Sequence, residues 1–210
     1  GDSITEGVGA SEDKYRYVDQ IAAMTGAVCR NYDVSGTRIS QQPDPSPSEC
    51  LDWDYDFLSR AKTMLDADVV VVFGGTNDFG HGYAPIGKME DRSQKTFYGA
   101  LHCLFTYLME RFPKAQLVVM TPLHRDNENN PMGDGGNRKT VATGVLRDYV
   151  VAEREVAEYY SIPVLDLYAV SGIQPAVKIN RELYLPDGLH PSDLGHRLIA
   201  EKFVNFMKLL

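Results

Sequence analysis

The chain has 210 residues, of which 43% are hydrophobic and 24% charged, a composition typical of a globular domain that buries its own core. A formal net charge of -8 and the absence of any Lys and Arg cluster argue against nucleic acid as a partner. No apolar stretch approaches the roughly 18 residues of a membrane span, so the sequence predicts a single soluble domain over residues 1–210, without membrane insertion.

Apolar runs alternate with helical patterns along the chain. In chain order, the patterns predict a helix at 13–25, a strand at 27–34, a helix at 54–66, a strand at 68–73, a helix at 92–111, a strand at 115–121, a helix at 139–160, a strand at 162–167 and a helix at 193–209. Short apolar strands between helices are typical of a parallel sheet. The sequence therefore predicts an α/β fold, a three-layer α/β/α sandwich.

Three loops follow predicted strands, at residues 40–50, 79–91 and 123–138. Open α/β sheets bind ligands at the carboxyl ends of their strands, so we interpret these loops as the rim of a site. Solvated surface loops are the alternative for most of their residues. The polar rings and cation that we expect to line the rim are His81, Tyr83, His124 and Arg125.

Ser3 lies in the opening motif GDSITEG (residues 1–7). A small residue two positions before the serine suits a tight strand-to-helix turn that exposes the hydroxyl. A serine after Asp is also common as a helix cap, so this motif alone is ambiguous. Thr5 stands where the G-x-S-x-G elbow has its second glycine, which disfavours an α/β-hydrolase.

Asp187 and His190 lie three residues apart, just before the last predicted helix. One turn of chain brings both side chains to the same side, where Asp187 can accept the Nδ1 hydrogen and leave Nε2 facing a nucleophile. A histidine that caps or packs is the alternative. Four other histidines compete for the role of base: His81, His102, His124 and His196. Of these, His102 and His196 fall inside helical patterns, where we expect packing or surface roles.

Asn77 and Gly36 are candidates for stabilising negative charge. Asn77 follows two glycines after the most apolar strand, and its amide can donate to a developing oxyanion. Gly36 follows the 27–34 run and can present a backbone N–H to the same oxygen, although ordinary turns explain both residues equally well. Asp2 and Asp78 flank the proposed site, where we expect them to brace loops through backbone hydrogen bonds, without a catalytic role.

The three cysteines, Cys29, Cys50 and Cys103, are odd in number and lack metal-ligand spacing. They indicate neither a disulfide framework nor a zinc site, and we expect buried or idle thiols. Free thiols favour the cytoplasm as a default location. The chain opens without Met or a leading strand, so we expect residues before Gly1, which leaves secretion open as the alternative.

The order of these blocks resembles that of the SGNH hydrolases, also called the GDSL esterase/lipase family. The matching segments are GDSITEG (1–7), Gly36 in VSGTRIS, GGTNDF (74–79) and DGLHPS (187–192), which span nearly the whole chain. The resemblance implies a flavodoxin-like sandwich of about five parallel strands, the first of which would precede Gly1. It also implies that Ser3 is the nucleophile, that Asp187 and His190 complete a triad, and that the N–H groups of Ser3 and Gly36 and the Asn77 amide form an oxyanion hole.

A serine ester hydrolase that works through an acyl-enzyme is the activity that the resemblance implies. No metal or organic cofactor is expected, because the imidazole moves protons and the oxyanion hole stabilises charge. The expected partner is a small-molecule ester, and the polar rim favours small or acetylated esters, including those of carbohydrates. The alternatives are a lysophospholipase- or thioesterase-type acyl hydrolase, and a non-catalytic binding module that would be expected to lack one of the key residues.

Overall fold

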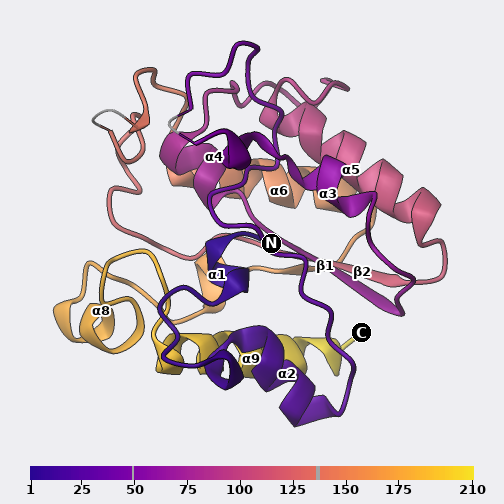
Figure 1. The fold of residues 1–210 in the computed structure, drawn as a ribbon, viewed down its shortest axis with the longest axis vertical. Coiled ribbons are helices and arrows are strands. Elements are labelled where there is room, and N and C mark those ends of the chain that lie inside the picture. Colours follow the sequence, from indigo (N-terminus) through magenta and orange to yellow (C-terminus); the bar gives the residue numbers. More distant parts are fainter. Residues whose placement is uncertain (49, 136–137) are drawn as a thin grey trace. The chain divides into compact units, whose positions relative to one another are not determined.

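The structure is a computed structural model that describes residues 1–48, 50–135 and 138–210 (Figure 1). Its internal contacts divide the chain into two compact units. The first unit comprises Gly1–Ser35, Leu123–Asp126 and Leu165–Leu210, and the second comprises Gly36–Pro122 and Asn127–Val164. The single domain expected over residues 1–210 stays a prediction.

The second unit contains two strands of the parallel sheet and the first residue of the third strand. Strands β1 (Val69–Phe73) and β2 (Gln116–Met120) pair in parallel, and β3 (Val164–Leu165) completes the order β1-β2-β3. β-branched residues dominate β1, as they do in strands that pack on a pleated, buried surface. Parallel strands need a crossover, which helix α5 (Phe97–Arg111) provides between β1 and β2. The predicted α/β class and the parallel sheet are therefore confirmed.

Helices of the second unit pack through aromatic side chains. Helix α5 contacts α6 (Leu146–Tyr159), and Figure 1 shows both on the same side of β1 and β2. The rings of Phe97 and Tyr149 meet edge to face with centroids 4.9 Å apart. The remaining helical elements of this unit are η2 (Leu51–Asp54), α3 (Phe57–Ala61) and α4 (Thr76–His81).

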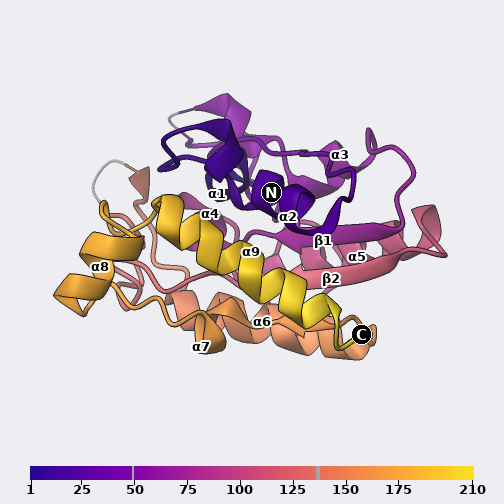
Figure 2. The same cartoon turned by 90° about the horizontal axis from the view of Figure 1, so that it is seen from below.

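In the first unit, Tyr17 of the second helix contacts both the amino-terminal helix and the last helix of the chain. Its hydroxyl lies 2.9 Å from Thr5 Oγ1 in α1 (Ser3–Glu6), and its ring stacks on His196 with centroids 6.2 Å apart. Tyr17 begins α2 (Tyr17–Thr25), which packs on α9 (Asp193–Met207), drawn along its length in Figure 2. The other elements of this unit are η1 (Asp13–Tyr15), α7 (Leu167–Val170) and α8 (Lys178–Tyr184).

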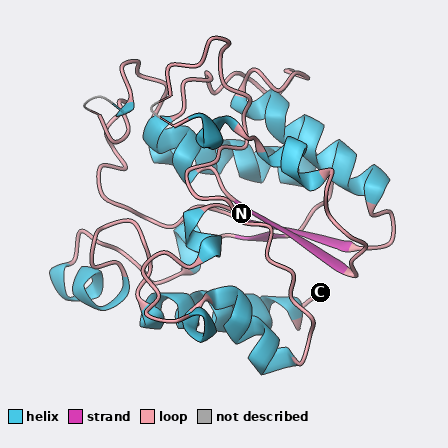
Figure 3. Cartoon of the chain, viewed as in Figure 1, coloured by secondary structure: helices cyan, strands magenta, loops and turns pink. Residues whose placement is uncertain are grey.

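The predicted strand at 27–34 is wrong, because the structure forms no strand there and these residues are loop in Figure 3. A strand needs a ladder of partners, but the hydrogen bonds that join this segment to Gly1 are two long ones, 3.3 Å from Val34 and 3.4 Å to Tyr32. Val28 is 84% exposed, unlike a residue in a central strand. The described residues thus contain three strands rather than about five.

Helix boundaries differ from the predictions where capping residues decide them. Helix α5 begins at Phe97 rather than at residue 92, because Thr96 accepts a hydrogen bond from the Gly99 N–H. Likewise, α3 starts only after its cap Asp56. The predicted helix at 139–160 begins at Leu146. The sequence did not predict four short helices, because four to seven residues give too little periodicity to detect. These helices are α1, α4, α7 and α8.

Two of the predicted loops extend beyond what the structure describes. Glu49 in the 40–50 loop, and Gly136 and Asn137 in the 123–138 loop, lie outside the described residues. In the 79–91 loop, the first three residues belong to α4 instead. The 79–91 prediction was wrong there because α4 continues the turn that follows β1.

The cysteines of the described chain are all free. Cys29 is exposed and Cys50 and Cys103 are partly exposed, so none of the three is a buried thiol, and the alternative of idle thiols stays a prediction. Within residues 1–48, 50–135 and 138–210, no group of three or more His, Cys, Asp or Glu is arranged to hold a metal ion. None of the described helices is long and apolar enough to cross a membrane.

The contact between Tyr17 and His196 predicts a loss of stability in acid. Burial lowers the pKa of His196 to about 4, and the Tyr17 N–H donates to its Nδ1, which only a neutral ring can accept. An unfolded histidine titrates near pH ~6.5, so the unfolded state binds the proton first as pH falls. We therefore expect the free energy of unfolding to fall by about 3 kcal/mol between about pH 6.5 and about pH 4.

Urea unfolding at a series of pH values measures this loss. The matched variant is His196→Gln, which has no titrating group at that position and should show a flatter profile than the native chain. Equal slopes in the two proteins would contradict the assignment to His196.

Candidate active site

Ser3, His190 and Asp187 come together in the first unit. Ser3 Oγ lies 3.2 Å from His190 Nε2, and Asp187 Oδ2 lies 2.6 Å from His190 Nδ1. A carboxylate only accepts hydrogen bonds, so it favours the tautomer with hydrogen on Nδ1 and leaves Nε2 to accept from the serine hydroxyl. A histidine within hydrogen-bond reach of a hydroxyl, and itself oriented by a carboxylate, can act as a general base.

Helix α1 positions Ser3 at its first residue. Asp2 caps the helix by accepting the Ile4 N–H at 3.0 Å, which confirms the expected bracing role of Asp2. The helix ends at Glu6 and is capped by Gly7, which adopts a left-handed conformation while its N–H donates to the Ser3 carbonyl at 3.1 Å. Hydrogen bonds on both sides of Ser3 thus hold the backbone that carries its side chain.

A tight turn holds Asp187 against His190. Asp187 Oδ1 accepts the backbone N–H groups of Leu189 at 2.8 Å and His190 at 2.7 Å, while Oδ2 faces the imidazole. Partial burial acts to raise the pKa of Asp187, but the hydrogen bonds from His190 and Leu189 outweigh it and hold that pKa below its ordinary value. Asp187 is therefore a carboxylate at neutral pH.

The segment after α1 packs closely against the turn that carries His190. Gly9 has a φ of 95°, and a Cβ at this position would collide with the Pro191 carbonyl. Two residues further on, the Ser11 N–H and hydroxyl each donate to Asp193 at 2.7 Å. Asp193 begins α9, so the start of this helix is tied to the chain that follows Ser3.

Asn77 and Asp78 belong to the second unit, in α4. Asn77 Nδ2 donates to the Thr37 carbonyl at 3.1 Å. Asp78 accepts the backbone N–H groups of Ile39 at 2.8 Å and Ser40 at 2.9 Å, and also the Ser40 hydroxyl. The expectation that Asp78 braces a loop through backbone hydrogen bonds is therefore confirmed.

Gly36 also belongs to the second unit, and its conformation needs a glycine. Its φ is 75°, and a Cβ there would collide with the indole ring of Trp53. The turn alone accounts for this residue. Its role as an N–H donor to substrate stays a prediction.

The expected rim residues have different environments. His81 lies in α4 and is buried, and Arg125 is also buried. That these residues line the rim of the site stays a prediction. His124 is half-buried and its ring lies over Tyr168, with centroids 3.8 Å apart. The Tyr83 N–H donates to Gln42 Oε1 at 2.7 Å. The packing roles expected for His102 and His196 are confirmed, because both are buried inside helices.

Sequence reasoning missed Arg38, which contacts His81 through its guanidinium group. The side chain is 1% exposed and pairs with Asp54 at 2.6 Å. Its only sequence signal is its place two residues after Gly36, in the same VSGTRIS segment. Trp53, which packs on the His81 ring with centroids 4.3 Å apart, has no such signal.

The motifs and the α/β fold together define the class of ester hydrolases to which this protein is assigned. The sequence model of the GDSL-like lipase/acylhydrolase family matches residues 1–198. The chain belongs to this family, and it is a hydrolase acting on ester bonds. No curated protein matches it in sequence.

Several solved structures share the fold. A protein from Lactobacillus plantarum is 29% identical, covers 100% of this chain and 94% of its own, and superposes with a TM-score of 0.83. A possible lipase from Chitinophaga pinensis DSM 2588 is 20% identical over 100% of this chain and 96% of its own, with a TM-score of 0.69. A two-domain esterase active on acetylated mannans is 16% identical over 100% of this chain and 47% of its own, with a TM-score of 0.61.

Proposed function

We propose that the protein is a serine carboxylic-ester hydrolase in which Ser3, His190 and Asp187 act as nucleophile, base and acid. The observation that carries the proposal is the 3.2 Å distance from Ser3 Oγ to His190 Nε2, with Asp187 on the other ring nitrogen. In the first step, His190 takes the hydroxyl proton while Oγ bonds to the ester carbonyl carbon. The C–O bond to the alcohol then breaks, and His190 returns the proton to the departing oxygen.

Water completes the reaction at the same histidine. His190 takes a proton from a water molecule, whose oxygen attacks the acyl carbon of the Ser3 ester. The bond from the acyl carbon to Oγ breaks, Ser3 recovers its proton, and the carboxylic acid is released. The ionised Asp187 stabilises the imidazolium that forms in each step, and its low pKa supports this role.

Each step passes through an oxyanion that needs hydrogen-bond donors. We propose the N–H groups of Ser3 and Gly36 and the side-chain amide of Asn77, on the ground of family membership. The Asn77 nitrogen carries two hydrogens, of which the Thr37 carbonyl accepts one. The second hydrogen supports a role for Asn77 as a donor to substrate.

Small or acetylated esters, including those of carbohydrates, are the proposed substrates. The polar rings of Tyr83 and His124 in the loops after the strands favour a substrate with polar groups over a long acyl chain. A two-domain esterase that shares this fold over 47% of its own chain is active on acetylated mannans, which supports this substrate class. Long-chain lysophospholipids and thioesters are the competing substrates.

A fluorophosphonate probe followed by peptide mapping tests the nucleophile. The phosphonyl adduct is expected on Ser3, and the Ser3→Ala protein should not react. An adduct on another serine would overturn the assignment, and the absence of any adduct together with no ester turnover would indicate a non-catalytic binding module.

Esters of p-nitrophenol with increasing acyl length test the substrate class. We expect kcat/KM to be highest for acetate and to fall toward octanoate, because the polar loops offer little apolar surface to a long chain. A rise toward octanoate would instead favour a lysophospholipase. Higher activity on the matched thioester than on the oxygen ester would favour a thioesterase.

A further inference from the structure

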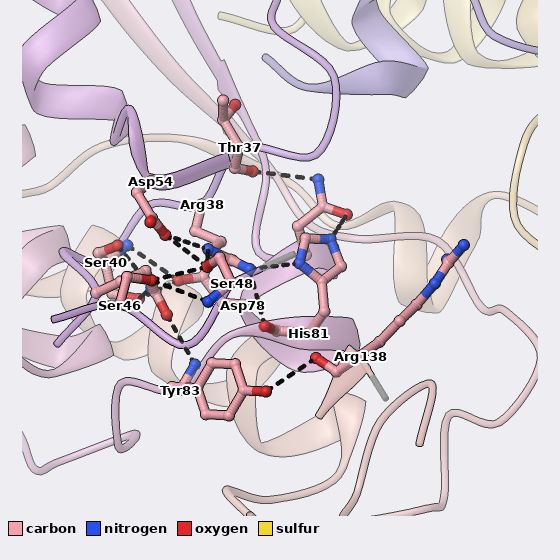
Figure 4. Close-up of polar contacts among 12 residues, drawn as sticks. Thr37, Arg38, Ser40, Ser46, Ser48, Asp54, Asp78, His81, Tyr83 and Arg138 are labelled. Carbon is pink, nitrogen blue, oxygen red and sulfur yellow. Dashed lines mark hydrogen bonds and ion pairs between the residues drawn. The ribbon is translucent and has the colours of Figure 1, made fainter. Parts of the chain in front are cut away.

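A chain of hydrogen bonds in the second unit leads from Asp54 through Arg38 and His81 to Asn77, and Figure 4 labels the first three of these residues. Asp54 Oδ1 accepts from Arg38 Nη1 at 2.6 Å, and Arg38 Nη2 lies 2.7 Å from His81 Nδ1. On the other side of the ring, His81 Nε2 lies 3.2 Å from Asn77 Oδ1. Asn77 Nδ2 then donates to the Thr37 carbonyl at 3.1 Å.

The direction of every hydrogen bond in this chain follows from Arg38. A guanidinium group only donates, so His81 Nδ1 must accept and the neutral ring carries its hydrogen on Nε2. Nε2 therefore donates to the Asn77 oxygen. The reversed amide would place its NH₂ group against the His81 N–H and its oxygen against the Thr37 carbonyl, so only one orientation of the amide is satisfied.

The surroundings hold Arg38 and His81 in place. Arg38 also donates to the Ser48 hydroxyl at 2.9 Å and to the His81 backbone carbonyl at 2.9 Å. The indole of Trp53 packs on the His81 ring, and the Arg38 guanidinium lies 5.7 Å from the centroid of the Trp53 ring. His81 and Asn77 are each 5% exposed, so water competes little for these bonds.

We infer that Arg38 and His81 are positioning residues that fix the Asn77 amide with its nitrogen, rather than its oxygen, available to a substrate oxyanion. This inference rests on the proposed function, in which Asn77 is a donor to that oxyanion. A donor held in place before reaction stabilises the transition state more than one that must reorient. An amide free to turn over would present its oxygen, which repels a negative charge.

Substitutions of His81 separate positioning from packing. His81→Phe keeps a ring beside Trp53 but removes the hydrogen bond to Asn77, whereas the amide of His81→Gln can accept from Arg38 and donate to Asn77. We expect His81→Phe to lower kcat by about tenfold with KM changed by less than about twofold. The reason is that a misplaced Asn77 amide weakens its hydrogen bond to the oxyanion of the transition state more than any contact with the bound substrate. His81→Gln should restore most of kcat.

A double-mutant cycle with Asn77→Ala shows whether His81 acts through Asn77. Asn77→Ala alone should lower kcat by about 10²- to 10³-fold, the usual cost of one oxyanion donor. In that background His81→Phe should lower kcat by less than about twofold, because the residue it positions is already absent. The matched control is His102→Phe, which removes a buried histidine of the same unit that bonds Tyr160 and the Met89 carbonyl. It should lower Tm but leave kcat unchanged.

Three outcomes would overturn the inference. The first is a fold-loss of kcat in the double variant equal to the product of the losses in the two single variants. The second is a kcat for His81→Gln no higher than for His81→Phe. The third is full activity of Asn77→Ala, which would also remove Asn77 from the oxyanion hole while labelling of Ser3 kept the hydrolase assignment. Absence of a Ser3 adduct would instead overturn the proposed function itself.

A second position keeps the test decisive if His81→Phe does not fold. Arg38→Met removes the donor that sets the His81 tautomer, whereas Arg38→Lys retains a cationic donor. We expect the kcat of Arg38→Met to fall several-fold in the native background and to be unaffected in the Asn77→Ala background. Equal losses in both backgrounds would show a purely structural role for Arg38 and overturn the inference.

Discussion

Replacing Ser3 by alanine is expected to lower kcat for ester hydrolysis by about 10⁵- to 10⁶-fold, the loss that follows removal of a serine nucleophile from a working triad. The variant lacks the oxygen that forms the acyl bond, so only direct attack by water remains. Residual activity would come from substrate binding and the oxyanion donors. Stopped-flow measurement of p-nitrophenol release, with mass spectrometry of the quenched protein, follows both turnover and the acyl-enzyme.

Ser11→Ala is the matched control for this substitution. Ser11 lies in the same unit, and its hydroxyl donates to Asp193 rather than to a histidine. We expect its kcat to stay within about twofold of the native value, since surface changes rarely cost more than about 0.5 kcal/mol. A Ser3→Ala protein that kept a tenth or more of the native kcat would exclude Ser3 as the nucleophile.

Replacing Asp187 by asparagine is expected to lower kcat by about 10⁴-fold, as when the equivalent carboxylate of a triad is lost. The backbone N–H groups of Leu189 and His190 both donate to Oδ1, so the oxygen of the new amide should stay there. Its NH₂ group would then face His190 Nδ1 and force the ring hydrogen onto Nε2. That hydrogen points at Ser3 Oγ, so His190 could no longer accept the serine proton.

Asp193→Asn serves as the control for Asp187→Asn. Asp193 is also an acidic residue near His190 in the chain, but its carboxylate accepts from Ser11. Its substitution should change Tm modestly and leave kcat within about twofold, as for other surface positions. In addition, combining Asp187→Asn with Ser3→Ala should cause little loss beyond Ser3→Ala alone, because residues that act as a unit are not additive. Independent losses would argue that Asp187 does not act through Ser3.

The sequence predicted the strands that are buried and missed the features that depend on partners. The run VVVVF at Val69–Phe73 has no reading other than a buried element, and the structure makes it β1. Residues 27–34 mix apolar residues with Arg30, Asn31 and Asp33. A strand also requires neighbouring backbone groups as partners, and composition does not report them. The short helix α4 depends in the same way on the turn after β1 rather than on periodicity.

The site shows the same division between local and distant contacts. Asp187 and His190 are three residues apart, so their approach could be predicted from one turn of chain. Arg38 and His81 are 43 residues apart, and Ile39 and Asp78 are 39 apart. Nothing in the spacing of such residues indicates that they meet, because the contact is made by the folded arrangement of the loop after Gly36 and α4.

The neutral His196 has a consequence for enzymology, since it belongs to the same unit as Ser3 and His190. Acid would then destabilise the unit that carries the proposed triad. Activity lost in this way recovers only as fast as the chain refolds. A rapid jump from acid back to neutral pH would therefore show a slow phase of recovery, which should disappear in His196→Gln.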